Sequence, residues 1–388
     1  EGEGAAQAQA QGQAGTDGWA AVYPQVNLLA QPAKRTDIDF SRFASGNIVK
    51  CAKWSPDGTC LLANSEDGQL RLFESSRLCS TGEVQPCFSA CTSEIVYDFA
   101  WFPHMTSALP PTACFVTCAK GRPVQLWDAY TGKLRCCYTA RTHVDELCAP
   151  VSAAFDPQGA NIYCGMSNEI RVFDLACPTG RATVIPTAGK KRKSLAQPGI
   201  ISCFAFPPDD SSVFYAGSYG GTVGLYSTQT GCVTHIIGAH TGGVTQVLCT
   251  HDSLLISGAR KDDNILVHDL RQLASPLFQL HRRCTTNQRL QFSLSPDGLH
   301  LVTGTTEGDV CLYDLKTGER LSSFVACQGT TITSAMVHPY LPWVATSSGH
   351  RPLTLTEDGE PADAVPGTTS LSIWEFPCHP SPPEEVSV

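Results

Sequence analysis

A unit of about thirty residues that reads strand, turn, strand, turn, strand is the feature that most restricts how this chain can fold. In residues 287–318, the alternating side chains Leu290, Phe292 and Leu294 lead to a Ser-Pro-Asp-Gly turn. A second run (299–304) leads to a Glu-Gly turn, and a third (310–314) ends in Lys-Thr-Gly. Apolar alternation of period two, cut by such turns, predicts short antiparallel strands.

The unit recurs seven times along the chain. Each third strand ends in an aromatic or histidine side chain followed by an acid or a serine: Phe73-Glu74, Trp127-Asp128, Phe173-Asp174, Tyr226-Ser227, His268-Asp269, Tyr313-Asp314 and Trp374-Glu375. The spacings of 54, 46, 53, 42, 45 and 61 residues bracket the ~40–45 of a WD-type propeller blade, with extra length in loops. The sequence therefore predicts an all-β, seven-bladed WD40 β-propeller.

The residues that precede the first complete unit offer a means of closing the ring. Ile38 and Phe40 alternate like a strand, and we expect this strand to pair with the last blade, since an open ring would expose unpaired edges. The domain prediction is a flexible Ala/Gln/Gly-rich lead-in (1–33), the propeller (34–376) with an acidic insertion in blade 7 (350–368), and a disordered Pro-rich tail (377–388).

Composition supports many short strands and argues against a membrane protein. The chain of 388 residues has 33 glycines and 26 prolines, and only 16% of it is charged, which suits frequent turns. It contains no run of 18 apolar residues, so we expect no membrane span.

The nineteen cysteines are an odd number in a chain with a full apolar pattern, which favours reduced thiols in a cytosolic or nuclear protein over a disulfide framework. Cys87 and Cys91, like Cys114 and Cys118, are four residues apart without matching histidines, so we expect no metal site. Several cysteines fall in strand-like runs, where a thiol packs as a small apolar group: Cys60, Cys164, Cys203, Cys249 and Cys311.

No catalytic motif is present. The sequence lacks Gly-x-Ser-x-Gly, a phosphate-loop Gly-Lys-Ser/Thr, His-Glu-x-x-His and a dinucleotide fingerprint. The glycine-rich residues 217–221 lie between two predicted strands and read as a turn. We therefore expect no enzymatic activity and no cofactor.

Basic side chains concentrate on one class of loop, although the net charge is −9. In a propeller, the turn between the second and third strands of a blade and the connection to the next blade lie on one face. These loops carry Lys120, Arg122, Arg141, His143, Lys190, Lys191, Arg192, Lys193, Tyr219, His240, Arg260, Lys261, His281, Arg282, Arg283, Gln288 and Arg289. Their acids are few: Asp145, Glu146, Asp262 and Asp263. A one-sided basic arc on an acidic protein predicts a phosphate-binding surface.

Some members of this arc have structural alternatives. The loop 190–193 fits a solvated loop or a nuclear import signal as well as an RNA contact. His240 occupies the place of a structural histidine that would bond Asp262 or Asp263, and this core role is favoured over an RNA contact; His143 has the same two readings.

Tyr219 fits stacking on an unpaired base or packing on its own blade equally well. Arg260 and Lys261 lie in a tight turn and are expected to project outward. The acids that end the third strands are expected to be structural: Asp128, Asp174, Asp269 and Asp314.

Several stretches outside the general WD pattern resemble the telomerase Cajal body protein family. They are residues 54–60 (WSPDGTC), 96–101 (VYDFAW), 199–203 (GIISC), 257–262 (SGARKD), 269–272 (DLRQ) and 285–289 (TTNQR). The similarity runs from about Asn47 to Gly349, which is nearly the whole predicted propeller. The chain departs from the family at its ends, where the lead-in and tail are short, so functions of the family's terminal extensions are in doubt.

The resemblance implies a non-enzymatic RNA-binding subunit of H/ACA small Cajal body RNPs and of the telomerase holoenzyme. Such a subunit recognises the CAB-box hairpin loop of small Cajal body RNAs and telomerase RNA, and directs these particles to Cajal bodies and telomerase to telomeres. The implied protein partners are the H/ACA core proteins, the telomerase reverse transcriptase complex and the cytosolic chaperonin during folding. The implied locations are the nucleus, Cajal bodies and telomeres, with the cytosol during folding.

Both lines of reasoning point to the same loops. Guanidinium groups and a flat surface suit a hairpin loop with splayed bases, so Arg260, Lys261 and Arg289 are the first candidates, followed by Arg282, Arg283 and the 190–193 loop. Two alternatives stay open: a WD40 scaffold that binds a peptide or an RNP protein without reading RNA, and a structural platform whose neighbours hold the RNA.

Overall fold

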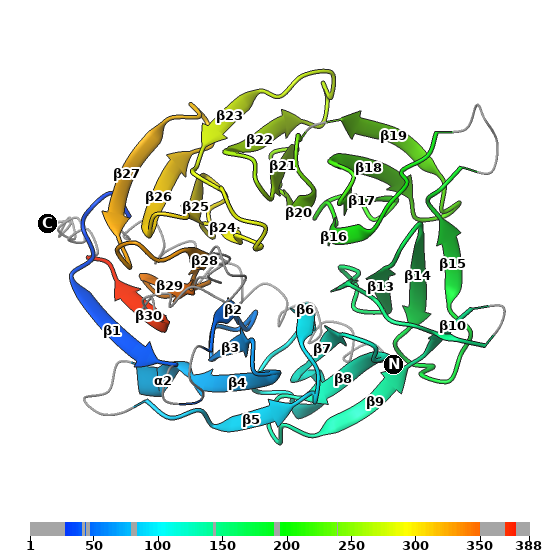
Figure 1. Ribbon diagram of the computed structural model, residues 1–388, viewed down its shortest axis with the longest axis horizontal. Helices are drawn as coiled ribbons and strands as arrows, with labels where there is room; N and C mark the ends of the chain where they lie inside the picture. Colours follow the sequence, from blue (N-terminus) through cyan, green and yellow to red (C-terminus); the bar gives the residue numbers. More distant parts are fainter. Residues whose placement is uncertain are drawn as a thin grey trace, which may run out of the picture.

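The protein is a ring of seven four-stranded antiparallel sheets, as Figure 1 shows down the ring axis. The computed structural model describes residues 28–40, 43, 47–78, 84–142, 145–189, 195–238, 240–349 and 369–377. The predicted all-β, seven-bladed propeller is confirmed. The lead-in up to residue 27, the 190–193 loop, the 350–368 insertion and the tail from residue 378 lie outside the described residues.

In each of the first six blades, the strands follow chain order from the axis outward. Blade 1 consists of β2 (Val49–Trp54), β3 (Cys60–Ser65), β4 (Gln69–Glu74) and β5 (Phe88–Cys91). Blade 2 consists of β6 (Val96–Trp101), β7 (Cys114–Ala119), β8 (Val124–Asp128) and β9 (Leu134–Tyr138). Blade 3 consists of β12 (Ser152–Phe155), β13 (Asn161–Gly165), β14 (Glu169–Asp174) and β15 (Thr183–Pro186).

Blade 4 consists of β16 (Ile201–Ala205), β17 (Val213–Ser218), β18 (Thr222–Ser227) and β19 (Val233–Gly238). Blade 5 consists of β20 (Val244–Cys249), β21 (Leu254–Ala259), β22 (Asn264–Asp269) and β23 (Phe278–His281). Blade 6 consists of β24 (Phe292–Leu294), β25 (His300–Gly304), β26 (Asp309–Asp314) and β27 (Arg320–Val325). The described residues also form the short elements α2 (Ser75–Leu78), η2 (Pro110–Thr112) and the pair β10 (Ala140–Arg141) and β11 (Leu147–Cys148).

Blade 7 is assembled from both ends of the described chain. It comprises β28 (Ile332–Val337), β29 (Trp343–Ser348), β30 (Ser370–Glu375) and, outermost, β1 (Lys34–Asp39). β1 runs antiparallel to β30, with Lys34 opposite Glu375 and Asp39 opposite Ser370. The predicted closure of the ring by an N-terminal strand is therefore confirmed.

The cores of the propeller lie between neighbouring blades. The second strand of a blade packs on both of its faces, so β7 is buried at every residue, whereas the outer strand β27 has no fully buried residue. At the closing junction, Ile38 and Phe40 pack in one cluster with Phe73 and Ile373. Burial of each such side chain stabilises the fold by about 1.5–3 kcal/mol.

Short polar turns define the blade ends. In the Ser-Pro-Asp-Gly turn of blade 1, the Asp57 carboxylate accepts a hydrogen bond from the Thr59 amide (3.1 Å), and Gly58 takes a positive φ of 69°. The acids that end the third strands act similarly. Their Oδ1 atoms accept amide hydrogen bonds from Thr131 (to Asp128, 2.8 Å), Ala176 (to Asp174, 2.8 Å), Arg271 (to Asp269, 2.9 Å) and Lys316 (to Asp314, 2.7 Å).

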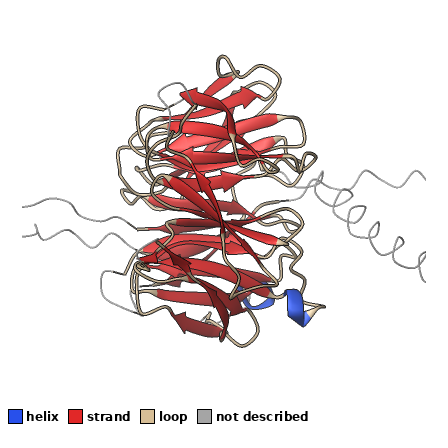
Figure 2. Cartoon of the chain, turned by 90° about the vertical axis from the view of Figure 1, so that its right-hand side faces the viewer, coloured by secondary structure: helices blue, strands red, loops and turns tan. Residues whose placement is uncertain are grey.

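Loops lie on both faces of the ring (Figure 2). We call the face with the second-to-third-strand turns and the interblade connections the linker face; it includes the turns after β17 and β21 and the connection from β23 to β24. The opposite face, with the turns that follow the first and third strands, is called the turn face.

His338 on the turn face links blade 7 to blade 1. Its Nδ1 accepts hydrogen bonds from the Tyr340 and Leu341 amides (3.0 and 2.9 Å), so its proton lies on Nε2, which donates to the Gly58 carbonyl (2.9 Å). Burial lowers the pKa of His338 to about 4.

We expect His338 to make the protein less stable as the pH falls from about 6.5 to about 4. In this window the unfolded histidine, with a pKa of ~6.5, binds a proton that the folded one does not, which costs up to about 3 kcal/mol. Urea unfolding at pH 7.5 and pH 5 should show this loss, and His338→Gln should reduce it. Equal pH dependence in both proteins would contradict the assignment.

Candidate nucleic-acid interface at the channel mouth

A cavity of about 560 Å³ opens on the linker face at the mouth of the central channel. Its wall combines aromatic, basic and amide side chains from blades 1, 2 and 4 and from the connection between blades 5 and 6. They include Lys50, Asn64, Tyr97, Lys120, Tyr219, Gln288 and Arg289. Its size falls in the range of pockets that enclose a small organic group.

Arg260 and Tyr219 form a stacked pair beside this cavity. The guanidinium carbon of Arg260 lies 4.4 Å from the centroid of the Tyr219 ring. The turns that carry them belong to neighbouring blades and meet because Gly243 has no side chain: a Cβ there would lie 2.9 Å from the Tyr219 Cα. The Arg260 amide also donates to the Gly243 carbonyl (3.0 Å). The cation–π contact contributes about 0.5–1 kcal/mol and holds both side chains at the mouth.

Lys261, next to Arg260, is exposed. Its backbone has a positive φ of 51°, and its amide donates to the Thr286 carbonyl (3.1 Å), which fixes the turn against the next connection. Among the described residues, neither Arg260 nor Lys261 forms an ion pair. Both charges are therefore available to a ligand.

A second cation–aromatic pair lies on another part of the cavity wall. Lys50 Nζ lies 5.9 Å from the Tyr97 ring centroid and donates to the Val96 carbonyl. Tyr97 is 37% exposed. No sequence pattern distinguishes Lys50, and Tyr97 is distinguished only by its place in the 96–101 stretch.

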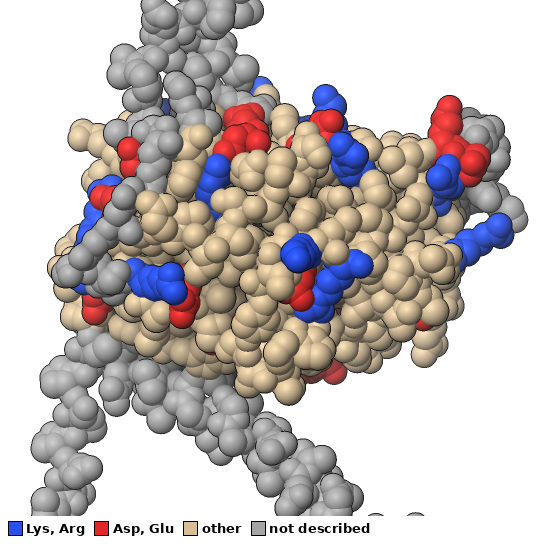
Figure 3. Space-filling model, turned by 90° about the horizontal axis from the view of Figure 1, so that it is seen from below, with Lys and Arg blue, Asp and Glu red and all other residues tan. Residues whose placement is uncertain are grey.

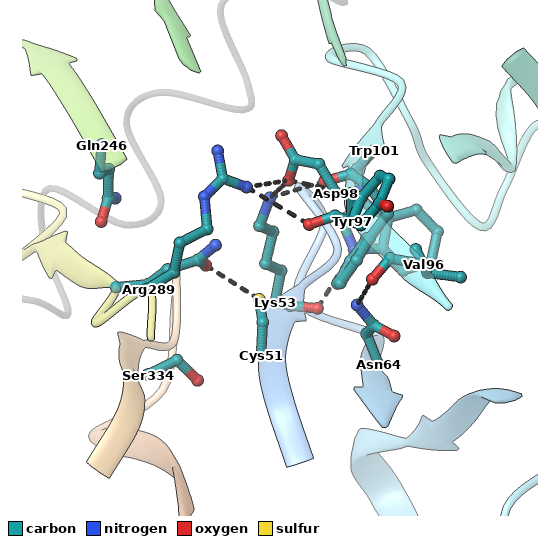
Figure 4. Close-up of polar contacts among 12 residues, drawn as sticks. Cys51, Lys53, Asn64, Val96, Tyr97, Asp98, Trp101, Gln246, Arg289 and Ser334 are labelled. Atoms are coloured by element: carbon teal, nitrogen blue, oxygen red, sulfur yellow. Dashed lines mark hydrogen bonds and ion pairs between the residues drawn. The ribbon is translucent and has the colours of Figure 1, made fainter. Parts of the chain in front are cut away.

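Arg289 points into the channel instead of standing on the rim (Figure 4). Its Nη1 lies 3.4 Å from Oδ1 of Asp98, which also takes the Lys53 ammonium at 3.3 Å. Nη1 also donates to the Tyr97 carbonyl (3.4 Å), and Nη2 donates to the Ser202 carbonyl. We call Arg289, Asp98 and Lys53 the channel cluster; it joins the start of blade 6 to blades 1, 2 and 4.

The channel cluster is charged in all its members. Burial alone would raise the pKa of Asp98, but Lys53 and Arg289 hold it below its ordinary value. Burial alone would lower the pKa of Arg289, but the Asp98 carboxylate raises it. The cluster therefore carries two positive charges and one negative charge, and Arg289 Nε remains buried without a hydrogen-bond partner.

Arg282 is enclosed in the core. It is 1% exposed, and its Nη1 donates to the Leu290 carbonyl (2.9 Å) and the Thr303 hydroxyl (3.1 Å). The connection after β23 turns inward at this residue, which the sequence did not reveal. The expectation that Arg282 faces a ligand is therefore incompatible with its position, and it is no longer a candidate contact.

Of the remaining predicted basic contact residues, the structure describes Arg283 and Arg122. Arg283 is exposed but pairs with Glu307 (3.1 Å). Arg122 is exposed on the turn of blade 2 and has no ion pair among the described residues. Lys190, Lys191, Arg192 and Lys193 lie outside the described residues.

His240 bonds Asp262, one of the two partners that the sequence offered. Its Nδ1 lies 2.9 Å from Asp262 Oδ2, and its Nε2 lies 2.9 Å from the Ser257 hydroxyl. Burial lowers the pKa of His240. Asp263 instead accepts a hydrogen bond from the Cys284 amide (2.6 Å). These side chains hold the 260–263 turn in place and thereby position Arg260 and Lys261.

Known proteins share sequence with most of this chain. The WD domain, G-beta repeat model matches residues 40–74. Telomerase Cajal body protein 1 of Mesocricetus auratus is 37% identical over 88% of this chain and 65% of its own length. The human protein of that name is 38% identical over 79% of the chain and 57% of its length, and the Drosophila melanogaster homolog is 34% identical over 78% and 57%. The chain is a homologue of telomerase Cajal body protein 1. It spans 57–65% of the length of these three relatives.

Most of the stretches that resemble the telomerase Cajal body protein family lie close together in the structure. Four of the six stretches that carry the resemblance contribute to the channel mouth: 96–101 through Asp98, 199–203 through Ser202, 257–262 through Arg260 and 285–289 through Arg289. These stretches come from blades 2, 4 and 5 and the connection to blade 6.

One side of the ring edge of this telomerase Cajal body protein homologue shows no gathered basic patch among the described residues. In Figure 3, which views the ring from its edge, the Lys, Arg, Asp and Glu side chains are scattered and intermixed. Within the described ranges, His, Cys, Asp and Glu side chains do not gather in threes as a metal ion would require, and no helix is long and apolar enough to cross a membrane.

Proposed function

We propose that this chain is a non-enzymatic RNA-binding WD40 subunit of H/ACA small Cajal body RNPs and of the telomerase holoenzyme. Its linker face contacts the CAB-box hairpin loop of these RNAs. The observation that carries the proposal is the Arg260–Tyr219 stack, which stands at the channel mouth beside the uncompensated charge of Lys261. The homology to telomerase Cajal body protein 1 supports the choice of RNA class.

The chemistry of the mouth suits an unpaired RNA loop. Bases that are not in a helix stack on aromatic rings and guanidinium planes, and each such contact contributes about 1–3 kcal/mol. Arg260 presents a guanidinium already held over the Tyr219 ring, so little side-chain freedom is lost on binding. Lys261 and Lys120 supply positive charge for the phosphates on either side.

The proposed role includes the partners and locations of such a particle. The chain would act with the H/ACA core proteins and the telomerase reverse transcriptase complex, in the nucleus, in Cajal bodies and at telomeres. Folding in the cytosol would involve the chaperonin, since closing the ring requires β1 to pair with β30 across most of the chain and such non-local pairing is slow.

Charge reversal at the stack tests the proposal. We expect Arg260→Glu with Lys261→Glu to weaken binding of an isolated CAB-box hairpin by about tenfold or more, and to reduce the dependence of affinity on salt, because phosphate contacts are lost. A matched control, Arg181→Glu with Lys316→Glu, makes the same charge change on exposed loops of the turn face. Both variants should melt normally. Equal affinity in the two variants would show that RNA binds elsewhere.

A protein–protein scaffold is the second candidate, and a groove on the turn face favours it. The groove encloses about 730 Å³ and is lined by Tyr130, Tyr340 and Leu341, which are 52%, 39% and 37% exposed. If the purified chain does not bind the isolated hairpin, or binds it with little salt dependence, this role replaces RNA binding.

A further inference from the structure

Asn64 is a buried amide whose oxygen lacks a partner. It lies at the end of β3, is 2% exposed and lines the cavity at the channel mouth. Its Nδ2 donates to the Val96 carbonyl (3.3 Å), which fixes the orientation of the amide. Oδ1 is buried and accepts no hydrogen bond. A buried acceptor without a donor costs about 1–3 kcal/mol, so this position is suited to a ligand that brings a donor.

The rest of the cavity restricts what that ligand is. Tyr97 and Tyr219 supply aromatic surfaces on its wall, Lys50 and Lys120 supply ammonium groups, and Glu66 and Asp98 supply carboxylates. The channel cluster lies at the inner end, where Arg289 Nε is a second buried group without a partner, in this case a donor. A flat group with hydrogen-bonding edges, attached to a phosphate chain, matches this wall better than an apolar peptide side chain does.

We propose that this cavity receives one unpaired nucleobase of the RNA loop, and that Asn64 Oδ1 accepts a hydrogen bond from the exocyclic amino group of that base. The inference rests on the proposed RNA-binding function and goes beyond it by naming a base pocket and a specificity-determining residue. Adenine, cytosine and guanine carry such an amino group, whereas uracil does not, so Asn64 discriminates against uracil at this position.

A series of modified hairpins tests the pocket. Each loop nucleotide is replaced in turn by an abasic residue to find a position where affinity falls at least tenfold. The exocyclic amino group of that base is then removed while the ring is kept. We expect the wild-type chain to lose about fivefold to tenfold in affinity on removal of this single group, which corresponds to one hydrogen bond.

Two variants assign the effect to Asn64. Asn64→Leu removes the acceptor and should bind the hairpin with the amino group and the hairpin without it equally. The control Gln229→Leu removes an exposed amide on the turn face and should keep the wild-type difference. The comparison is made between two RNAs within one variant, so a change in stability of Asn64→Leu does not affect it.

The outcomes separate this inference from the proposed function. If the wild-type chain does not bind the intact hairpin, the proposed function fails. If it binds but tolerates loss of the amino group at every loop position, or if the sensitive base is uracil, the base pocket is overturned and RNA binding stands. A difference that persists in Asn64→Leu assigns the amino group to another acceptor.

Discussion

Replacing Asp98 by alanine is expected to destabilise the folded protein by about 3–5 kcal/mol. The change leaves the Arg289 guanidinium, whose side chain is only 16% exposed, in the channel without its carboxylate, and an uncompensated buried charge is costly. Lys53 is affected less, because its ammonium also donates to the Phe99 carbonyl (2.6 Å). Urea unfolding followed by circular dichroism should show a lower midpoint with an unchanged slope.

A second substitution distinguishes loss of charge pairing from loss of packing. Adding Arg289→Met to Asp98→Ala removes the unpaired guanidinium and should recover part of the lost stability. An apolar side chain of similar length destabilises the fold less than a buried, unpaired ion does. Arg271→Ala, which breaks an exposed pair with Asp269 on the turn face, should change stability little. A double variant no more stable than Asp98→Ala would show that the channel cluster is not a coupled unit.

Replacing Phe40 by alanine is expected to cost about 3–5 kcal/mol and to loosen the closure of the ring. Phe40 is fully buried where β1 ends, and its ring lies 5.6 Å from the guanidinium carbon of Arg71 in blade 1. Its truncation leaves a cavity in the cluster that joins blade 7 to blade 1. Denaturant unfolding measures the total loss, and amide hydrogen exchange measures where the fold opens.

Phe115→Ala is the matched control for this prediction. Phe115 is also fully buried, but it lies within β7 of blade 2, so a similar loss of stability is expected. Only Phe40→Ala should selectively reduce protection of the paired amides of β1 and β30. Equal protection of these strands in the two variants would indicate that Phe40 acts as an ordinary core residue and not as part of the closure.

The ring could be predicted from the sequence because its signals are local. Each blade ends in turns whose chemistry is visible in three or four residues, such as the Ser-Pro-Asp-Gly turn at 55–58 and the acids that cap the third strands. The seven third-strand endings predicted from the sequence coincide with the ends of β4, β8, β14, β18, β22, β26 and β30.

The candidate site was harder to predict because the direction of a side chain in a connection is not a local property. Arg282, Arg283 and Arg289 lie in one ten-residue connection, yet the first is enclosed, the second pairs with Glu307, and the third points into the channel. The packing of blades 5 and 6 separates the first two positions, and contacts to blades 2 and 4 across the channel set the third.

Asn64 and Asp98 were missed for a related reason. Both lie inside strands made mostly of apolar residues. A single polar residue there looks like an ordinary strand residue until the position of the adjacent blade is known. Asp98 alone had a signal, since it belongs to the 96–101 stretch that resembles the telomerase Cajal body proteins.

The channel cluster has a mechanical consequence. Neighbouring blades pass a displacement around the circumference one sheet at a time, whereas Arg289 ties the base of blade 6 to carbonyls and a carboxylate on blades 2 and 4. A displacement of blade 6 is therefore transmitted through Arg289 directly to blades 2 and 4, across the central channel. A ligand bound against Arg289 would reduce the motion of the blades relative to one another, and the blades would move more when no ligand is bound there.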